Sequence, residues 1–113
     1  MGSINKIEYN QNNIFKKIID KHIPANIVLE DESCMAFYDI TPQAKTHILI
    51  IPKLECVDFE DFLSKAKEIR YFFEFITKVV QKLGLSDYQL KTNKGRGAGQ
   101  EVFHFHVHLL SNL

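Results

Sequence analysis

The sequence is poor in several residue types and patterns, and each shortage excludes a class of protein. Cysteine occurs only as Cys34 and Cys56, far apart and without a CxxC pair, so we expect neither a disulfide framework nor a cysteine zinc site. The longest aliphatic run is Ile48–Ile51, far short of the roughly 20 residues of a membrane-spanning helix. Neither charge is in excess, since 14 Lys and Arg balance 14 Asp and Glu. This balance argues against nucleic acid or an anionic membrane as a partner.

The N-terminal stretch MGSINKIEYNQNN is also without the apolar segment of a signal peptide, and Lys6 does not fit a myristoylation signal. We therefore expect a soluble protein of a reducing, cytoplasmic compartment. The length of 113 residues suits one domain over residues 1–113, with residues 1–11 as a flexible N-terminal segment. Apolar residues make up 45% of the chain, which is enough for one hydrophobic core.

Hydrophobic periodicity predicts one short helix, one long helix and five strands. The short helix covers residues 12–20, with Asn12 or Asn13 as its N-cap. The long helix covers residues 57–84, with Asp58 or Ser64 as its cap and Gly84 just past its end. The predicted strands are residues 25–30, 34–40, 46–52, 87–93 and 101–110. This order indicates an α+β domain in which the helices pack on a five-stranded antiparallel sheet.

Three of the five histidines lie on alternate residues of the last predicted strand, at His104, His106 and His108. Alternate side chains share one face of a strand, so the three imidazoles should point one way. The residues between them should enter the core: Phe103, Phe105, Val107 and Leu109. Three interpretations are open: a solvated polar face, a zinc site completed by His47, or a site in which one imidazole is a nucleophile.

A glycine-rich loop, TNKGRGAGQ, precedes this strand. It is neither a P-loop nor a Rossmann fingerprint, and a flexible hairpin loop is the simpler interpretation. Beside three histidines, however, its backbone N–H groups could form a phosphate cradle. Further donors and local positive charge would come from Asn93, Lys94, Arg96 and Gln100.

The stretch HFHVHLL matches the signature His-φ-His-φ-His-φ-φ, where φ is apolar, at every position. Together with Ile14–Lys53 and Thr92–Val102, it makes residues 14–110 resemble the histidine-triad (HIT) family, in its nucleotide-binding branch. The resemblance implies a homodimer whose two sheets join into a ten-stranded sheet. It also implies that purine nucleotides are bound and that the bond between the α-phosphate and a leaving group, typically an amine, is cleaved.

The resemblance further assigns roles to individual residues. His106 would attack phosphorus and form a nucleotidyl-histidine, His108 would contact the phosphate, His104 would orient the site, and His47 would lie beside the leaving group. Asp39 would bind the ribose hydroxyls. The base pocket would be formed by Ile14, Phe15, Ile18, Phe37, Tyr38 and Ile40, and the phosphate side by Asn93, Gly99, Gln100 and Glu101. The scheme requires no metal and no cofactor.

Simpler roles for some of these residues are open, and two features depart from better-known relatives. The apolar pocket residues could be ordinary core, Asp39 could be a turn residue, and His47 could be a hydrogen-bonded core histidine. Glu101 stands where a serine hydroxyl often contacts the phosphate, so we expect it to alter rate or leaving-group preference. The triad is followed by LLSNL rather than by the glycine pair found in many relatives. This difference weakens the expectation of a dimer.

The function expected from this reading is a purine nucleoside phosphoramidate hydrolase that releases AMP or a related monophosphate. Two alternatives are open. One is a dinucleoside polyphosphate hydrolase, which would share the mechanism but not the leaving group. The other is a purine-nucleotide-binding regulatory or scaffolding dimer with incidental catalysis.

Overall fold

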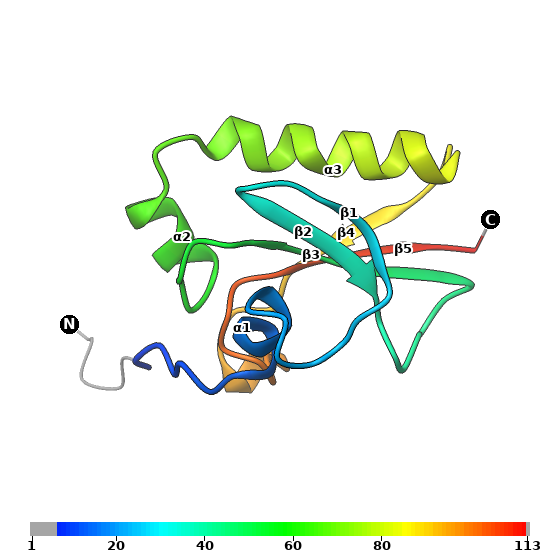
Figure 1. The fold of residues 1–113 in the computed structure, drawn as a ribbon. Helices are drawn as coiled ribbons and strands as arrows, with labels where there is room; N and C mark the ends of the chain where they lie inside the picture. Colours follow the sequence, from blue (N-terminus) through cyan, green and yellow to red (C-terminus); the bar gives the residue numbers. More distant parts are fainter. Residues whose placement is uncertain (1–6, 113) are drawn as a thin grey trace.

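The computed structural model describes residues 7–112, which form a five-stranded antiparallel sheet with helices on both faces (Figure 1). The elements are α1 (Ile14–Ile19), β1 (Ile27–Glu30), β2 (Cys34–Tyr38), β3 (Thr46–Pro52), α2 (Phe59–Lys65), α3 (Ile69–Leu83), β4 (Gln89–Lys91), the 3₁₀ turn η1 (Arg96–Ala98) and β5 (Val107–Ser111). The strand order is β1-β2-β3-β5-β4 and every neighbouring pair is antiparallel. The α+β class predicted from the sequence is confirmed.

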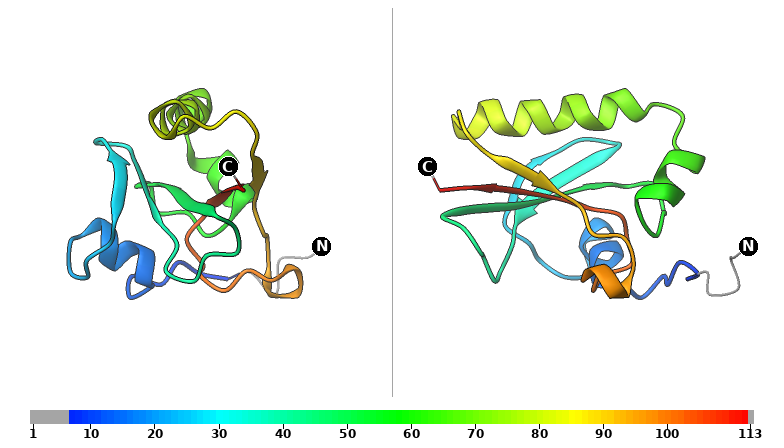
Figure 2. Two further views of the ribbon diagram at one scale, coloured as in Figure 1. Left: turned by 90° about the vertical axis from the view of Figure 1, so that its right-hand side faces the viewer. Right: turned by 180° about the vertical axis from the view of Figure 1, so that it is seen from behind.

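The sheet separates two hydrophobic clusters, because alternate residues of its strands point to opposite faces. The views in Figures 1 and 2 show α3 along one face and α1 on the other. On β3, Ile48 and Ile50 belong to the cluster on the α2 and α3 face. Leu49 and Ile51 belong to the smaller cluster on the α1 face. The smaller cluster is formed by Phe15, Ile18, Met35, Phe37, Leu49 and Ile51.

Three helix ends form at residues that the sequence predicts. Asn13 is the N-cap of α1, where its side chain accepts a hydrogen bond from the backbone N–H of Lys16 at 2.9 Å. Gly84 ends α3 in the left-handed conformation, at φ 67°, which glycine adopts without the strain of a side chain. Asp58 caps α2, where its side chain accepts from the N–H of Asp61.

The single long helix predicted for residues 57–84 is wrong, because Ala66 is extended, at ψ 136°, and divides it into α2 and α3. Packing explains the break. The rings of Phe62 and Phe72 both contact Phe105, with centroids 4.8 and 5.5 Å from its ring. In one continuous helix they would be separated by about 15 Å along the axis and would face different directions. The turn lets both rings cover the same residue.

The last strand is also shorter than predicted, since β5 begins at Val107 and residues 101–106 approach it without ladder pairing. Phe105 is anchored there by its backbone N–H, which donates to the carbonyl of Cys56 at 2.8 Å. Phe105, Val107 and Leu109 are buried as expected, but Phe103 is not in the core. Its ring lies against the guanidinium of Arg96, 4.7 Å from Cζ to centroid.

Part of the N-terminal segment that is expected to be flexible contacts the rest of the fold. Tyr9 bonds to His104 and Gln11 to Glu55, each at 2.6 Å. Residues 1–6 lie outside the described part of the chain. Among residues 7–112, no helix is both long and apolar enough to cross a membrane.

Candidate active site

A cavity of about 370 Å³ opens between α1, the end of β2 and the loop before β5. Its wall is apolar over most of its area, and its polar residues include Asp39, Glu101, His106 and His108. Eleven of the residues predicted for the site line it: Ile14, Phe15, Ile18, Phe37, Tyr38, Asp39, Ile40, Gly99, Glu101, His106 and His108. These eleven residues come from four separate segments of the chain, and the fold brings them to one cavity.

His106 presents one ring nitrogen to this cavity. Its Nδ1 lies 2.8 Å from the backbone carbonyl of His104, and because a carbonyl only accepts, Nδ1 carries the proton. The lone pair of a neutral His106 is therefore on Nε2. Burial lowers the pKa of His106 below its usual value, which keeps the ring neutral. Phe15 supports the ring edge-on, at 4.9 Å between centroids.

His47 and His108 form a pair in which each proton can be placed from its partners. The backbone N–H of Gln43 donates to Nδ1 of His47 at 3.1 Å, so the proton of a neutral His47 is on Nε2. That Nε2 lies 2.9 Å from Nδ1 of His108, which accepts it. The proton of His108 is then on its own Nε2. Burial and the neighbouring charges lower the pKa of His108 to about 4, so this N–H is a neutral donor.

Strand register explains why His108 reaches the cavity. Leu49 of β3 lies opposite His108, and Phe37 of β2 lies opposite Leu49. On the other side, Lys91 of β4 lies opposite His108. The charge of Lys91 helps to lower the pKa of both His47 and His108. The sheet thus presents one row of side chains to the site, from an aromatic ring to a cation.

His104 does not line the cavity but lies behind it, fully buried. Its Nε2 is 2.7 Å from the carbonyl of Pro52 and therefore carries the proton. Its Nδ1 is 2.6 Å from the hydroxyl of Tyr9, which donates. Burial lowers the pKa of His104 to about 4. Both ring nitrogens are bonded within the protein, so His104 acts on the site through its backbone carbonyl to His106.

Asp39 serves two purposes at once. Its Oδ1 accepts hydrogen bonds from the backbone N–H and hydroxyl of Thr41, at 2.8 and 3.1 Å, and so closes the turn after β2. Its Oδ2 lies 3.4 Å from Nε2 of His47. Asp39 therefore forms the turn considered for it, and its second oxygen lies beside a site histidine.

The glycine loop is built differently from a phosphate cradle. Its amides at residues 98, 99 and 100 donate to the carbonyls of Gly95 and Arg96, so these three N–H groups are committed within the loop. Gly95 and Gly99 both have φ 91°, which allows the tight turns. Gln100 is buried and braces the loop, since it donates to the carbonyl of Val57 and accepts from the N–H of Gly95. The predicted cradle is wrong for these amides.

Asn93 is also a brace, since its side chain donates to the carbonyl of Ala98 at 2.7 Å. Asn93, Gln100, His47 and His104 are thus the predicted site residues that do not line the cavity. The cavity also contains residues that the sequence analysis missed: Ile23, Pro24, Ala25, Thr41, Leu49 and Val102. Leu49 could have been predicted, because it lies two residues after His47 in a predicted strand and so shares its face.

A metal ion has one place to bind among the described residues. Ligand atoms of Asp39, His47 and His108 lie within 4.8 Å of one another, but a cation there would displace the hydrogen bond between the two histidines. The three triad histidines do not converge as a zinc site, since both nitrogens of His104 are bonded elsewhere.

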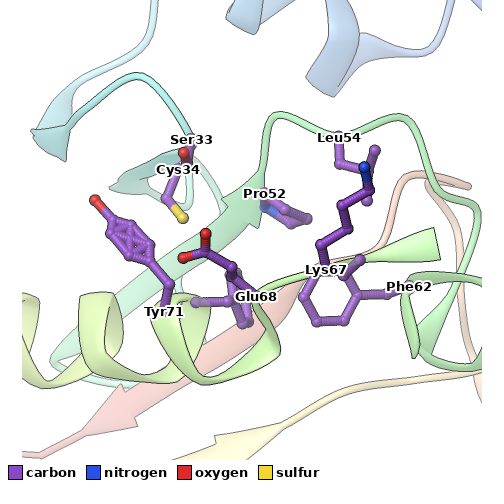
Figure 3. Close-up of a pocket in the computed structure, with 10 residues that line it drawn as sticks. Ser33, Cys34, Pro52, Leu54, Phe62, Lys67, Glu68 and Tyr71 are labelled. Atoms are coloured by element: carbon purple, nitrogen blue, oxygen red, sulfur yellow. The ribbon is translucent and has the colours of Figure 1, made fainter. Parts of the chain in front are cut away.

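A second cavity, of about 440 Å³, lies at the turn between α2 and α3 (Figure 3). Its wall includes Cys34, Glu68 and Tyr71, and the hydroxyl of Tyr71 donates to Asp31. Burial raises the pKa of the Cys34 thiol to about 12, so this sulfur is protonated and is a poor nucleophile. With no histidine in its wall, this cavity lacks the acid–base groups of the first.

Comparison with known proteins agrees with the histidine geometry. The model of the HIT domain matches residues 20–112. The chain belongs to the HIT domain family. An uncharacterized HIT-like protein of Rickettsia prowazekii (strain Madrid E) is 48% identical over 106 residues, covering 90% of this chain and 88% of that protein. The HIT match begins at residue 20, so α1 and the segment before it lie outside the matched range.

Two solved HIT structures are similar over most of the chain. A HIT family hydrolase from Clostridium thermocellum superposes with a TM-score of 0.85 and 39% identity, covering 92% of this chain and 93% of that one. A histidine triad nucleotide-binding protein from Candida albicans superposes with a TM-score of 0.69 and 34% identity, covering 87% and 73%.

Proposed function

We propose that this chain is a HIT-family nucleotide hydrolase, and more specifically a purine nucleoside 5′-phosphoramidate hydrolase. The observation that carries the proposal is the state of His106. A buried, neutral imidazole has one nitrogen held by a backbone carbonyl and presents the other to a cavity of nucleotide size. The similarity to a named hydrolase and a named nucleotide-binding protein supports the general class.

The neighbouring groups fit nucleotidyl transfer. Nε2 of His106 would attack the α-phosphorus as the bond to the leaving amine breaks, and the amine would depart with a proton from solvent, which the later attack of water returns. Nε2–H of His108 would donate to a phosphate oxygen, where charge develops. Water would then break the bond between phosphorus and His106, which releases the nucleoside monophosphate and restores the neutral ring. The base would lie against the apolar side chains of Phe15 and Phe37. Asp39 would accept hydrogen bonds from the ribose hydroxyls.

The charges of the cavity favour a phosphoramidate over a dinucleoside polyphosphate. Asp39 and Glu101 are its acidic wall residues, and no Lys or Arg of residues 7–112 lines it. Lys91 lies beside His108 on the neighbouring strand, outside the cavity wall. A polyphosphate leaving group would bring several negative charges to this wall, whereas an amine brings none.

The test is hydrolysis of adenosine 5′-phosphoramidate by the wild-type chain and by His106→Ala, with EDTA present. We expect AMP release by the wild type alone, with AMP binding retained by the variant. No release by either protein, with AMP still bound, would contradict the hydrolase and favour the nucleotide-binding scaffold. Release that EDTA abolishes would contradict the prediction that the site needs no metal.

The homodimer is a separate proposal, which the edge of the sheet supports. β4 is an edge strand, all three of its residues are exposed, and Tyr88 and Leu90 present apolar surface there. Pairing of β4 with its copy would cover this edge and join two sheets into ten strands. Size-exclusion chromatography with light scattering at micromolar concentration should give twice the chain mass of 13.1 kDa, and a monomeric mass would contradict it.

A further inference from the structure

The segment that precedes α1 reaches the triad from outside the range matched to the HIT family. Residues 7–13, named here the N-terminal strap, are held by a turn in which the carbonyl of Asn10 accepts from Asn13. The strap is fixed at a second point where the amide of Gln11 donates to Glu55 at 2.6 Å. Lys16 forms an ion pair with the same carboxylate at 3.2 Å. These contacts place the phenol of Tyr9 against His104.

The contact is directional. Because Nε2 of His104 gives its proton to the carbonyl of Pro52, Nδ1 has only a lone pair to offer, and the hydroxyl of Tyr9 must donate. The two rings also meet edge-on, with centroids 5.5 Å apart. Tyr9 is therefore the group that satisfies the second nitrogen of a fully buried histidine.

His104 in turn holds His106, because its carbonyl accepts the Nδ1 proton that leaves Nε2 of His106 free for attack. We propose that Tyr9 is a positioning residue for the reaction: it fixes the orientation of His104, and through it the placement of His106. The proposal rests on the proposed hydrolase function. It adds a residue from the N-terminal strap to a site otherwise built from the sheet, α1 and the loop before β5.

Removal of the hydroxyl has a defined consequence. In Tyr9→Phe, Nδ1 of His104 would be a buried acceptor without a donor. A tyrosine hydroxyl can donate to the neutral ring or accept from the protonated one, so both forms of His104 would lose a partner and the ring would be held less firmly. The charged groups that act on this ring are Glu55, Lys16 and a protonated His106. All three are present in both proteins, so the change would report the hydroxyl alone.

The experiment compares the full wild-type chain with Tyr9→Phe and with a matched control, Tyr71→Phe. The control also removes a hydrogen-bonded hydroxyl, but this one donates to Asp31, which is not part of the site. Hydrolysis of adenosine 5′-phosphoramidate is followed as kcat and KM. We expect Tyr9→Phe to lower kcat about tenfold, with KM within about twofold, because misplacement of a nucleophile is costly while ground-state binding is unchanged. Tyr71→Phe should leave both constants unchanged.

Nitrogen-15 NMR of the histidine rings provides a readout that is independent of activity. The wild type should show His104 as the Nε2–H tautomer, and Tyr9→Phe should shift the Nδ1 resonance of this ring, because its hydrogen-bond donor is lost. An unchanged kcat and an unchanged His104 spectrum in Tyr9→Phe would overturn the proposal, as would an equal loss of kcat in Tyr71→Phe. If the wild type hydrolyses nothing, the hydrolase function fails, and the NMR comparison still decides whether Tyr9 controls His104.

Discussion

The two faces of the sheet have different roles, although the same strands form both. The face covered by α2 and α3 has a continuous apolar core, and the rings of Phe62, Phe72 and Phe105 pack together within it. The face covered by α1 has a smaller apolar cluster, and the space beside it is the histidine-lined cavity. A step of one residue along β3 or β5 moves a side chain from one face to the other. The protein therefore separates stability from chemistry by strand alternation.

The polar groups on the α1 face are fully hydrogen-bonded. Among the described residues, no buried side-chain nitrogen or oxygen is without a hydrogen-bond partner. Backbone groups bond to three of the four site histidines: the N–H of Gln43 and the carbonyls of Pro52 and His104. Because these backbone groups fix the tautomers, the path of the backbone sets the chemistry of the site.

Adjacent substitutions at residues 105 and 106 test this separation most strongly. Phe105→Ala should lower the free energy of unfolding by about 3–5 kcal/mol, because it leaves a cavity among the aromatic rings. His106→Ala should lower it by no more than about 1–2 kcal/mol, the cost of one carbonyl without its donor. Urea denaturation followed by circular dichroism measures both. A larger loss of stability in His106→Ala than in Phe105→Ala would contradict the separation.

Acid should weaken the polar face next. Burial lowers the pKa of His104 from 6.5 to about 4. The unfolded chain therefore binds this proton below about pH 6.5, and the folded chain binds it only below about pH 4. Folding loses stability as the pH falls through this window, on the order of 3 kcal/mol from His104 alone.

Denaturation at pH 6.5 and pH 4.5 checks this prediction by difference. His104→Gln should show a smaller loss of stability between the two pH values than the wild type, because it cannot take up the proton. His22→Gln, which changes an exposed histidine after α1, is the matched control and should behave as the wild type. Equal losses in all three proteins would show that groups other than His104 cause the acid sensitivity.

The sequence predicted the sheet because strands depend on local periodicity, whereas most of the cavity wall was implied by the resemblance to the HIT family. Alternation placed Leu109 and Val107 in the core, and Asn13 and Gly84 marked helix ends through short-range hydrogen bonding and backbone conformation. The break at Ala66 could not be predicted in this way. No proline or glycine marks it, and its cause is the shared contact of two distant rings with Phe105.

The same limit applies to the site. The triad spacing indicated which histidines gather, but the state of each ring depends on partners far away in the sequence. Tyr9 lies 95 residues from His104, in a segment whose composition resembles a flexible end. Gln100 and Asn93 have donor side chains suited to phosphate, yet the loop uses both to hold itself together. Residue type predicts what a side chain can do, and tertiary contacts decide which of those things it does.

Neighbouring residues of β3 provide a subtler test of the two faces. Ile48→Ala and Leu49→Ala should each cost about 2–5 kcal/mol of stability, since both are buried. Only Leu49 lines the cavity, so only Leu49→Ala should weaken AMP binding, by about tenfold. Isothermal titration calorimetry at a temperature where both variants are folded measures the difference. Equal affinities in the two variants would place the nucleotide away from this wall.

The smallest expected effect comes from two charges near the site, one in the cavity wall and one on the neighbouring strand. Glu101 lines the wall, and Lys91 lies opposite His108 on β4. For a pair of adenosine phosphoramidates whose amines end in an ammonium or a carboxylate, Glu101→Gln should shift kcat/KM toward the carboxylate by about threefold, because exposed charges interact weakly. Lys91→Gln should shift it by a similar factor toward the ammonium. A shift of the same sign in both variants would show that leaving-group choice depends on shape rather than on charge.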